Sequence, residues 1–292
     1  MILSILLSIL ILLVVAFGYT LVKDVIAHKN EPKTKPYWFT GLVGLITNFL
    51  DTLGIGSFAQ ITAIFKATKA VDDKIIPGTL NVANAIPIAL QALIFINIVE
   101  VDVITLTSLI VSATFGAWLG AGIVSRFNRK RIRLVMGFAL AATAALMILR
   151  MVGIFEMDGN AQGLTGWLLV AGIVGNFILG ALMTAGVGLY APCMAMIFLL
   201  GMSLKTAFPI MMGSCAFLMQ VAGIRFINKG KYARKPSASI AITGCIGVTL
   251  AALLFSFITS FSRSLDILMI IVIIVVLYTS ATMLYSALKP NP

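Results

Sequence analysis

The chain has 292 residues, of which 60% are hydrophobic and 11% are charged, and this balance excludes an ordinary soluble domain. Several apolar runs exceed the roughly 20 residues that a helix needs to cross a bilayer, so the sequence predicts an all-α polytopic membrane protein. The net charge of +11 does not indicate a nucleic-acid partner, because the Lys and Arg residues lie between apolar runs, where the positive-inside rule places them.

The first apolar run covers residues 2–22 and is followed directly by Lys23. It has no basic segment before it and no small-residue cleavage site, so we expect a transmembrane helix here and not a signal peptide. Because positive charge favours the cytoplasmic side, the amino terminus is expected outside the cell and the polar loop 23–36 inside.

The stretch Asn48–Ser57 interrupts a long apolar run with an acid, hydroxyl groups and two glycines. Its pattern Thr-x-Gly-x-Gly recurs 132 residues later in Thr184–Gly188, and Pro77 recurs at the same offset as Pro209. A shared glycine pattern followed at the same distance by a shared proline indicates an internal duplication, with a broken helix at the same place in each half.

The two broken segments, 37–69 and 165–201, are too long to be single straight spans. If each enters the membrane and returns to the same side, 18 Lys and Arg residues lie inside and 3 outside, whereas if both cross the split is 11 to 10. The positive-inside rule therefore favours two re-entrant hairpins. The other spans are predicted at about 77–98, 103–125, 134–153, 206–227, 237–260 and 265–288.

Each half then contains one re-entrant hairpin and three full spans, and this odd number inserts the second half upside down relative to the first. The predicted organisation is an N-terminal transmembrane helix and cytoplasmic loop at 1–36, a first repeat at 37–155 and an inverted second repeat at 156–292. We expect a multi-pass protein of a bacterial or archaeal cell membrane, with its carboxyl terminus in the cytoplasm.

The broken helices have features of an anion site. Gly54 and Gly56 supply the backbone freedom for a sharp turn, after which Ser57 and Gln60 are predicted to form a capping box on the returning half-helix. Pro192 takes the corresponding place in the first turn of the second returning half-helix. Each such helix directs its amino end, with free N–H groups and partial positive charge, at the protein centre, which favours an anion.

The helix after each hairpin adds polar groups, and Asn81, Asn84 and Gln91 lie at helical spacing on one face. These side chains would equally serve to form hydrogen bonds with neighbouring helices. The hairpin glycines would equally serve to permit close packing, and Tyr190 either packs against other residues or lines a cavity. The candidate substrate-binding residues are Asn48, Thr52, Gly54, Gly56, Ser57, Gln60, Asn81, Asn84, Thr184, Gly186, Gly188, Tyr190 and Ser214.

Asp51 is the acid in the middle of an apolar segment, where a charge costs at least a few kcal/mol. It lies at the carboxyl end of the entering half-helix, whose partial negative charge opposes a second one. We predict a role in proton or cation coupling, with a Na⁺ site made of Asp51 and nearby carbonyl groups as the competing form. The alternative is a neutral carboxyl that bonds a neighbouring helix, and Met183 at the matching position of the second half is consistent with that.

Enzymatic motifs are missing from the sequence. It contains no HExxH or Walker motif, and its single His28 lies in a charged loop. Cys193, Cys215 and Cys245 fall in apolar stretches without a CxxC pattern. The prediction is therefore a non-enzyme with no cofactor and no metal.

Three features together carry a family resemblance: the two glycine-broken segments, the small and polar stretch Pro77–Asn81, and the basic loop Asn128–Lys130 after a glycine-rich span. From about Gly41 onward the chain resembles the TauE/SafE family, the sulfite exporter or toluene-sulfonate uptake permease family. This resemblance implies movement of sulfite, sulfonates and related sulfur-containing organic anions, often as export.

The expected function is a secondary transporter of small anions, with sulfite or organosulfonates implied by the resemblance, that works by alternating access with a site between the two hairpin tips. The alternatives are an anion channel of the same architecture and a membrane assembly partner that transports nothing. The expected partners are a small anion and the lipid bilayer, with a proton or Na⁺ as coupling ion and no nucleic acid. The direction of transport and the formation of a homo-oligomer stay open.

Overall fold

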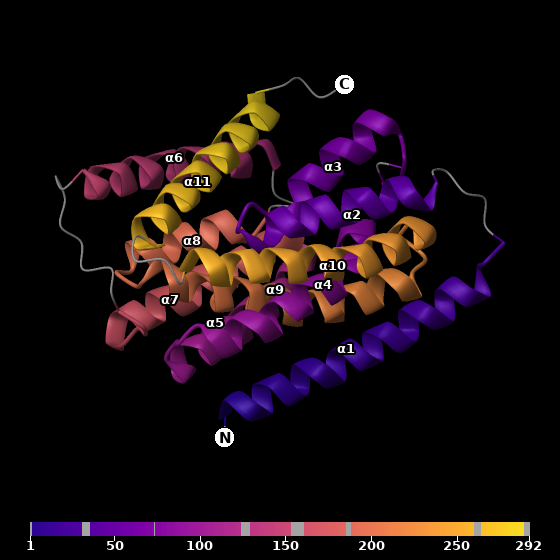
Figure 1. Cartoon of the computed structure of the whole chain (residues 1–292), viewed down its shortest axis with the longest axis horizontal. Helices are drawn as coiled ribbons and strands as arrows, with labels where there is room; N and C mark the ends of the chain where they lie inside the picture. The colour runs from indigo at the N-terminus through magenta and orange to yellow at the C-terminus, as the bar shows by residue number, and fades with distance from the viewer. Residues whose placement is uncertain are drawn as a thin grey trace. The chain divides into compact units, whose positions relative to one another are not determined.

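The computed structural model describes residues 2–30, 36–72, 74–123, 129–152, 161–184, 188–259 and 264–288. Throughout these ranges the regular elements are α-helices, as the apolar runs predict (Figure 1). In chain order they are α1 (Ile2–Ala27), α2 (Tyr37–Thr52), α3 (Ser57–Thr68), α4 (Ile76–Ile98), α5 (Val103–Ile123), α6 (Arg129–Met151), α7 (Gly166–Thr184), α8 (Tyr190–Leu199), α9 (Leu204–Asn228), α10 (Arg234–Thr259) and α11 (Ser264–Leu288).

Five helices in the described part of the chain are long and apolar enough to cross a membrane: α1, α4, α7, α9 and α10. The predicted spans at 103–125, 134–153 and 265–288 are also helical, as α5, α6 and α11, with shorter apolar stretches among their described residues. The all-α, multi-pass membrane class is thus confirmed. Because α7 is the first arm of the second broken segment, its length alone does not distinguish a span from a hairpin arm.

The chain forms two compact units, and each is built from segments that lie far apart in the sequence. Unit 1 comprises Met1–Asn97 and Met212–Leu254, and so contains α1 to α4, the later part of α9 and most of α10. Unit 2 comprises Ile98–Met211 and Phe255–Pro292, and contains α5 to α8, the first part of α9 and α11.

In unit 1, α2 and α10 run side by side in the same direction (Figure 1). Near the start of both helices, Ser239 Oγ donates a hydrogen bond to the carbonyl oxygen of Tyr37 at 3.0 Å. Further along, a Cβ added at Gly247 would lie 3.0 Å from the backbone nitrogen of Phe49. Small residues at such a crossing let two helix backbones approach closely in a membrane.

α4 runs in this direction too. The backbone N–H of Ala233, just before α10, donates to Thr79 Oγ1 near the start of α4 at 2.9 Å, and Pro87 further along α4 lies against Gly244 of α10. Because α2 and α4 are parallel, α3 has to carry the chain back to the end of the unit from which α2 starts. The first broken segment is therefore a hairpin within unit 1.

In unit 2 the second broken segment also returns to its starting point. The backbone N–H of Ser203, after α8, donates at 2.9 Å to the carbonyl oxygen of Ala161, before α7, and Met202 forms a β-bridge with Ala161. Along the two arms, Cys193 Sγ of α8 lies 3.9 Å from Asn176 Oδ1 of α7. Both broken segments are thus hairpins in their own units, while their relation to the faces of a bilayer stays a prediction.

Helix contacts in the two units correspond at the offset of the predicted duplication. A Cβ at Gly116 of α5 would overlap the carbonyl oxygen of Phe177 in α7, and a Cβ at Gly247 of α10 would overlap that of Leu45 in α2. Leu45 and Phe177 are 132 residues apart, and the two glycines match this offset to within one residue. A duplicated chain would give this pattern, and the inversion of its halves stays a prediction.

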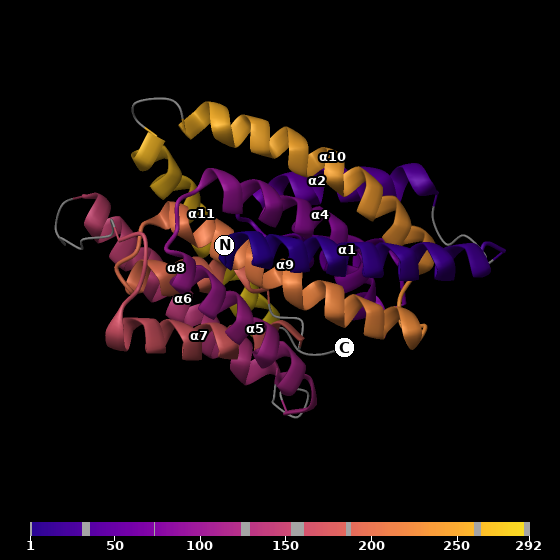
Figure 2. The same ribbon diagram turned by 90° about the horizontal axis from the view of Figure 1, so that it is seen from below.

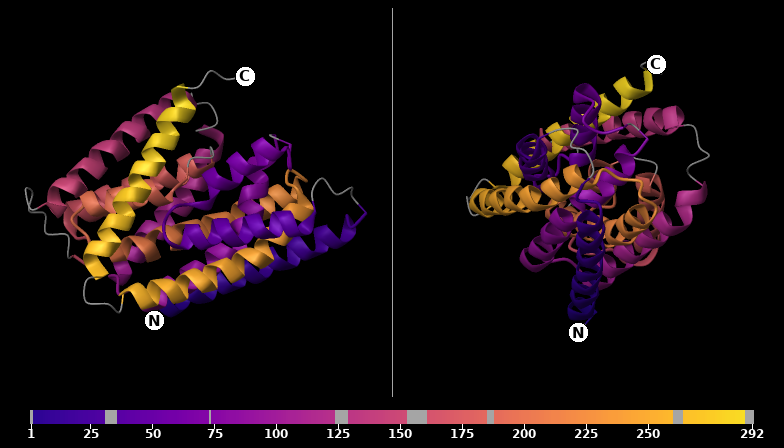
Figure 3. Two further views of the ribbon diagram at one scale, coloured as in Figure 1. Left: turned by 45° about the horizontal axis from the view of Figure 1, so that its top comes forward. Right: turned by 90° about the vertical axis from the view of Figure 1, so that its right-hand side faces the viewer.

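The remaining helices pack along these hairpins. In unit 1, the ring of Phe17 in α1 fills the space above Gly223 of α9, where the two helices lie together (Figure 2). In unit 2, α6 and α11 lie side by side (Figure 3, left), and Ser280 Oγ of α11 donates to the carbonyl oxygen of Gly137 in α6 at 2.7 Å.

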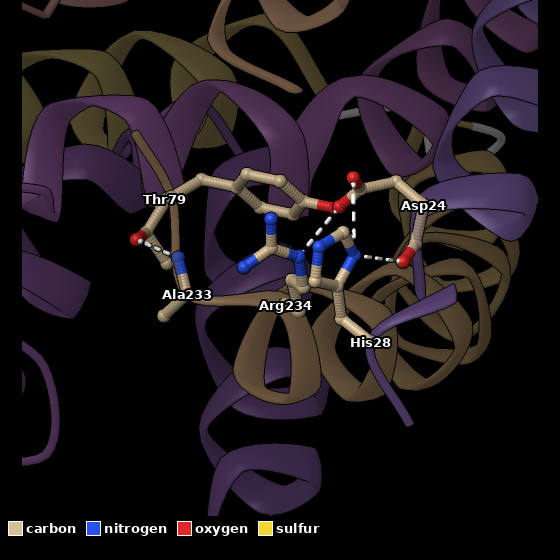
Figure 4. A network of polar contacts seen from close by, with 6 residues as sticks. Asp24, His28, Thr79, Ala233 and Arg234 are labelled. Carbon is tan, nitrogen blue, oxygen red and sulfur yellow. Dashed lines mark hydrogen bonds and ion pairs between the residues drawn. The ribbon is translucent and has the colours of Figure 1, made fainter. Parts of the chain in front are cut away.

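A polar junction ties α1 to the start of α10 (Figure 4). Arg234 Nε and the hydroxyl of Tyr232 each donate to Asp24 Oδ2 at 2.6 Å, and His28 Nδ1 lies 3.4 Å from Asp24 Oδ1. With Thr79 bonded to the same loop, the junction gathers the basic loops around α1, α4 and α10 at one end of unit 1. The re-entrant topology requires this gathering of the three loops.

Replacing Asp24 with alanine is expected to destabilise unit 1 by about 1–3 kcal/mol, because it removes a charged acceptor from Arg234 and leaves the buried Tyr232 hydroxyl without that bond. His28→Ala, at a half-exposed position on the same carboxylate, is the control and should cost less than about 0.5 kcal/mol. Thermal unfolding in detergent compares the two variants, and equal midpoints would contradict the structural role of Asp24.

Candidate functional site

The break in the first hairpin depends on two glycines. α2 ends at Thr52, where the backbone N–H groups of Gly54 and Ile55 bond back to the carbonyl oxygens of Asp51 and Leu50. Gly54 has φ 96° and Gly56 has φ 81°, conformations that side-chain-bearing residues rarely adopt. This confirms that both glycines serve the sharp turn.

Asp51, and not Ser57, caps the returning helix. The predicted capping box is wrong: Gly56 is the N-cap of α3, Ser57 is its first residue, and Gln60 Nε2 donates to the carbonyl oxygen of Gly56 at 3.1 Å. Asp51 Oδ1 instead accepts a hydrogen bond from the backbone N–H of Ser57. A carboxylate from the end of α2 reaches this N–H across the turn, and its negative charge suits the helix amino end better than a hydroxyl does.

Two polar contacts join α2 to α4. Asn48 Nδ2 donates to Asn84 Oδ1 at 3.0 Å, and Gln91 Nε2 donates to Asp51 Oδ2 at 2.9 Å and to Thr52 Oγ1 at 3.0 Å. Asn84 and Gln91 are both 0% exposed and lie two helical turns apart on one face of α4. Gln91 is absent from the predicted site residues, although its spacing on the Asn84 face was the signal that could have added it.

Three side-chain atoms in this unit are buried without a hydrogen-bond partner in the described part of the chain: Asn48 Oδ1, Ser57 Oγ and Gln220 Oε1. Gln220 lies on α9, where its Nε2 donates to the carbonyl oxygen of Ala85 in α4 at 2.8 Å. Burial of a polar atom without a partner costs free energy, so each such atom calls for an explanation such as a bound ligand or a second conformation.

The structure brings together five of the predicted residues, which with Gln91 we call the polar cluster: Asn48, Asp51, Thr52, Ser57, Asn84 and Gln91. Besides Gly54 and Gly56 of the turn, three more predicted residues belong to unit 1. Asn81 Nδ2 bonds to the carbonyl oxygen of Pro77 within α4, Gln60 is half-buried beside the N-cap of α3, and Ser214 is buried on α9.

The predicted residues of the second hairpin belong to unit 2. Tyr190 is the first residue of α8 and is 5% exposed, and Gly188 lies just before it with no described heavy atom within 4 Å of an added Cβ. Pro192 lies in the first turn of α8, as predicted. Gly186 and the side chain of Thr184 lie outside the described residues.

The amino end of α3 already holds the carboxyl group of Asp51, and a helix amino end favours a negatively charged group. Beside it, an added Cβ at Gly56 would meet no described heavy atom within 4 Å. In the part of the chain that the structure describes, no three His, Cys, Asp or Glu side chains come together as metal ligands.

Broken helices that form hairpins, one of them with a buried polar cluster, inside a multi-pass helical protein are typical of membrane transporters. The family model described as Sulfite exporter TauE/SafE matches residues 1–147, half of the chain, and the chain belongs to this family of membrane transporters. The match begins before Gly41 and covers the whole first hairpin with its polar cluster. No curated protein and no solved structure gave a match.

Proposed function

We propose that the chain is a secondary transporter of small sulfur-containing anions, sulfite or organosulfonates, and not an enzyme. The observation that carries this proposal is the bond from the Ser57 N–H to the Asp51 carboxylate, because it marks a buried helix amino end that accepts an anion. Membership of the TauE/SafE family supports the choice of sulfur-containing anions.

The proposed binding residues are those of the polar cluster around the α3 amino end, together with the Gly54–Gly56 turn. Oxygens of a sulfonate would accept the Ser57 N–H and hydroxyl, and the amides of Asn48 and Asn84, which are bonded to each other, are proposed to add further polar contacts. The second hairpin, through Gly188 and Tyr190, is proposed to supply further contacts. Asp51 is proposed as the coupling residue, with a proton or Na⁺ as the coupled ion.

The proposed mode of action is alternating access by two inverted halves in a bacterial or archaeal cell membrane, with the amino terminus outside and the carboxyl terminus in the cytoplasm. Hairpins that return to their starting points in both units support this topology, as does the gathering of basic loops at one end of unit 1. The direction of net transport depends on the gradients across the membrane.

Purified protein in detergent is expected to be stabilised against heat by isethionate, sulfoacetate, taurine or sulfite, and less by carboxylate analogues. The matched variants are Asn84→Leu, which removes a buried amide of the polar cluster, and Asn97→Leu, which removes an exposed amide at the end of the same helix. We expect the first to lower anion affinity at least about tenfold and the second to leave it unchanged.

Two measurements separate the proposal from its rivals. In proteoliposomes, uphill anion flux driven by a proton or Na⁺ gradient is expected, whereas flux that only follows the anion gradient would indicate a channel. If no anion of the panel shifts the unfolding temperature, the proposed function is wrong and a membrane assembly role takes its place.

A further inference from the structure

We infer that the Asp51 carboxylate and the transported anion compete for the amino end of α3, so that the anion binds when Asp51 takes up a proton and one proton accompanies each anion. This inference rests on the proposed function and specifies its coupling ion. It starts from an observation that sequence reasoning did not anticipate, namely that the helix end expected to be open to the substrate already holds an acid of the same chain.

The α3 amino end can serve one anion at a time. The Ser57 N–H is the first N–H of the helix, and Asp51 Oδ1 accepts it. An added Cβ at Gly56, the preceding residue, would meet no described heavy atom within 4 Å, so a ligand oxygen can approach this N–H from the Gly56 side. Two negative charges within a few ångströms repel strongly at a buried position such as that of Asp51. The transported anion is therefore excluded while Asp51 is ionised.

Protonation of Asp51 allows Asn48 Oδ1 and Ser57 Oγ each to gain a hydrogen-bond partner. Asn48 lies three residues before Asp51 on the same face of α2, and its Oδ1 is a buried acceptor without a hydrogen bond among the described residues. It can accept the proton of a neutral Asp51 carboxyl. The Ser57 N–H is then released to the anion. Ser57 Oγ, which is buried and has no hydrogen-bond partner among the described residues, can donate a second hydrogen bond to the anion.

Two of the three unpartnered atoms, Asn48 Oδ1 and Ser57 Oγ, are thus explained by a second state of the same cluster. In the state of this structure, Asp51 is held by the Ser57 N–H and by Gln91 Nε2. In the proposed anion-bound state, the anion takes the Ser57 donors and the neutral carboxyl bonds to Asn48. The step is a proton uptake by Asp51 that balances one negative charge of the anion, without bond breakage in the substrate.

The pH dependence of binding involves Asp51 and the titratable groups on the helices packed around it. Among helices α2, α3, α4 and α10 and the α9 residues of unit 1, Asp51 is the one residue with a carboxyl side chain. Helix α4, which contacts Asp51, has no titratable side chain. The other titratable residues on these elements are Tyr37 on α2, Lys66 on α3, Cys215 and Arg225 on α9, and Arg234, Lys235 and Cys245 on α10.

The test measures isethionate binding to the full-length protein by calorimetry between about pH 5 and about pH 9, an interval that begins just above the ordinary pKa of a carboxyl group. Isethionate is chosen because its sulfonate stays ionised throughout. The dissociation constant of the wild-type protein is expected to rise by up to about tenfold per pH unit above the titration of Asp51. In Asp51→Asn the constant is expected to be independent of pH.

A second measurement on the unmodified protein keeps the test decisive if Asp51→Asn does not fold. In weak buffers of different ionisation enthalpy, isethionate binding to the wild type is expected to take up one proton per anion. Binding without proton uptake, or an unchanged pH profile in Asp51→Asn, would overturn the competition while leaving the transporter proposal intact. Absence of isethionate binding at every pH would instead contradict the proposed function, and the inference falls with it.

Discussion

Replacing Gly180 with alanine is expected to prevent unit 2 from reaching its native packing. A Cβ at this position would overlap the carbonyl oxygen of Ala113, where α7 crosses α5. The obstacle is backbone within a helix, so it cannot move aside as the end of a flexible side chain would. Overpacking of this kind typically costs about 1–3 kcal/mol, and we expect the upper end of this range or more because two helices have to separate.

Gly18→Ala in α1 is the matched control, because an added Cβ there meets no described heavy atom within 4 Å. In a helix this substitution is expected to be neutral or to stabilise by up to about 1 kcal/mol. Monodispersity and thermal unfolding in detergent compare the two variants. If Gly180→Ala unfolds at the wild-type temperature, the close approach of α5 and α7 is not a feature of the protein in solution.

Local sequence patterns predicted the elements well because the physical causes are local. Long apolar runs form helices in a membrane protein. Two glycines separated by one residue allow a helix to end in a sharp turn, because glycine readily adopts the positive φ that Gly54 and Gly56 have. The prediction that the broken segments are hairpins used only the distribution of Lys and Arg. Within each unit the chain does return to its starting end, as the parallel α2 and α4 indicate in unit 1 and the bond between Ser203 and Ala161 shows in unit 2.

The pairing of distant helices could not be predicted in this way. Leu45 and Gly247 meet across some 200 residues of sequence, and no local pattern states that α2 and α10 are neighbours. A glycine in an apolar run indicates that something approaches closely, but it does not identify the approaching helix. The duplication gave a hint, since a contact between two residues implies a counterpart between the residues that correspond to them at the 132-residue offset.

Within the candidate site, the residue types were predicted better than their roles. The polar cluster contains Asn48, Thr52 and Asn84 as expected, but the capping role fell to Asp51 in place of Ser57. A capping box is read from residues three apart, whereas Asp51 reaches the helix end across a turn whose path depends on the positive φ of Gly54 and Gly56. The sequence predicted Asp51 as a coupling residue separate from the substrate contacts, whereas in the structure Asp51 occupies the helix end that is proposed to bind the anion.

Gly56→Val is expected to weaken anion binding at least about tenfold, equivalent to about 1.4 kcal/mol, because the branched side chain would fill the approach to the Ser57 N–H. Valine at φ 81° also strains the backbone by about 1–3 kcal/mol, so stability falls as well. Gly166→Val is the control that imposes backbone strain without filling the approach to the Ser57 N–H. Gly166 also has positive φ, 54°, and no described heavy atom near an added Cβ, but it starts α7 in unit 2.

The comparison of three variants then locates the site. Gly166→Val should lose stability and keep the affinity of the wild type for isethionate, which separates strain from obstruction. Gly188→Val, at the second hairpin, also has room for its Cβ, and no positive φ is involved there. Weaker binding in both Gly56→Val and Gly188→Val means that both hairpins contact the anion. An effect at Gly56 alone places the anion on the first hairpin, and unchanged affinity in both variants would show that neither hairpin tip binds it.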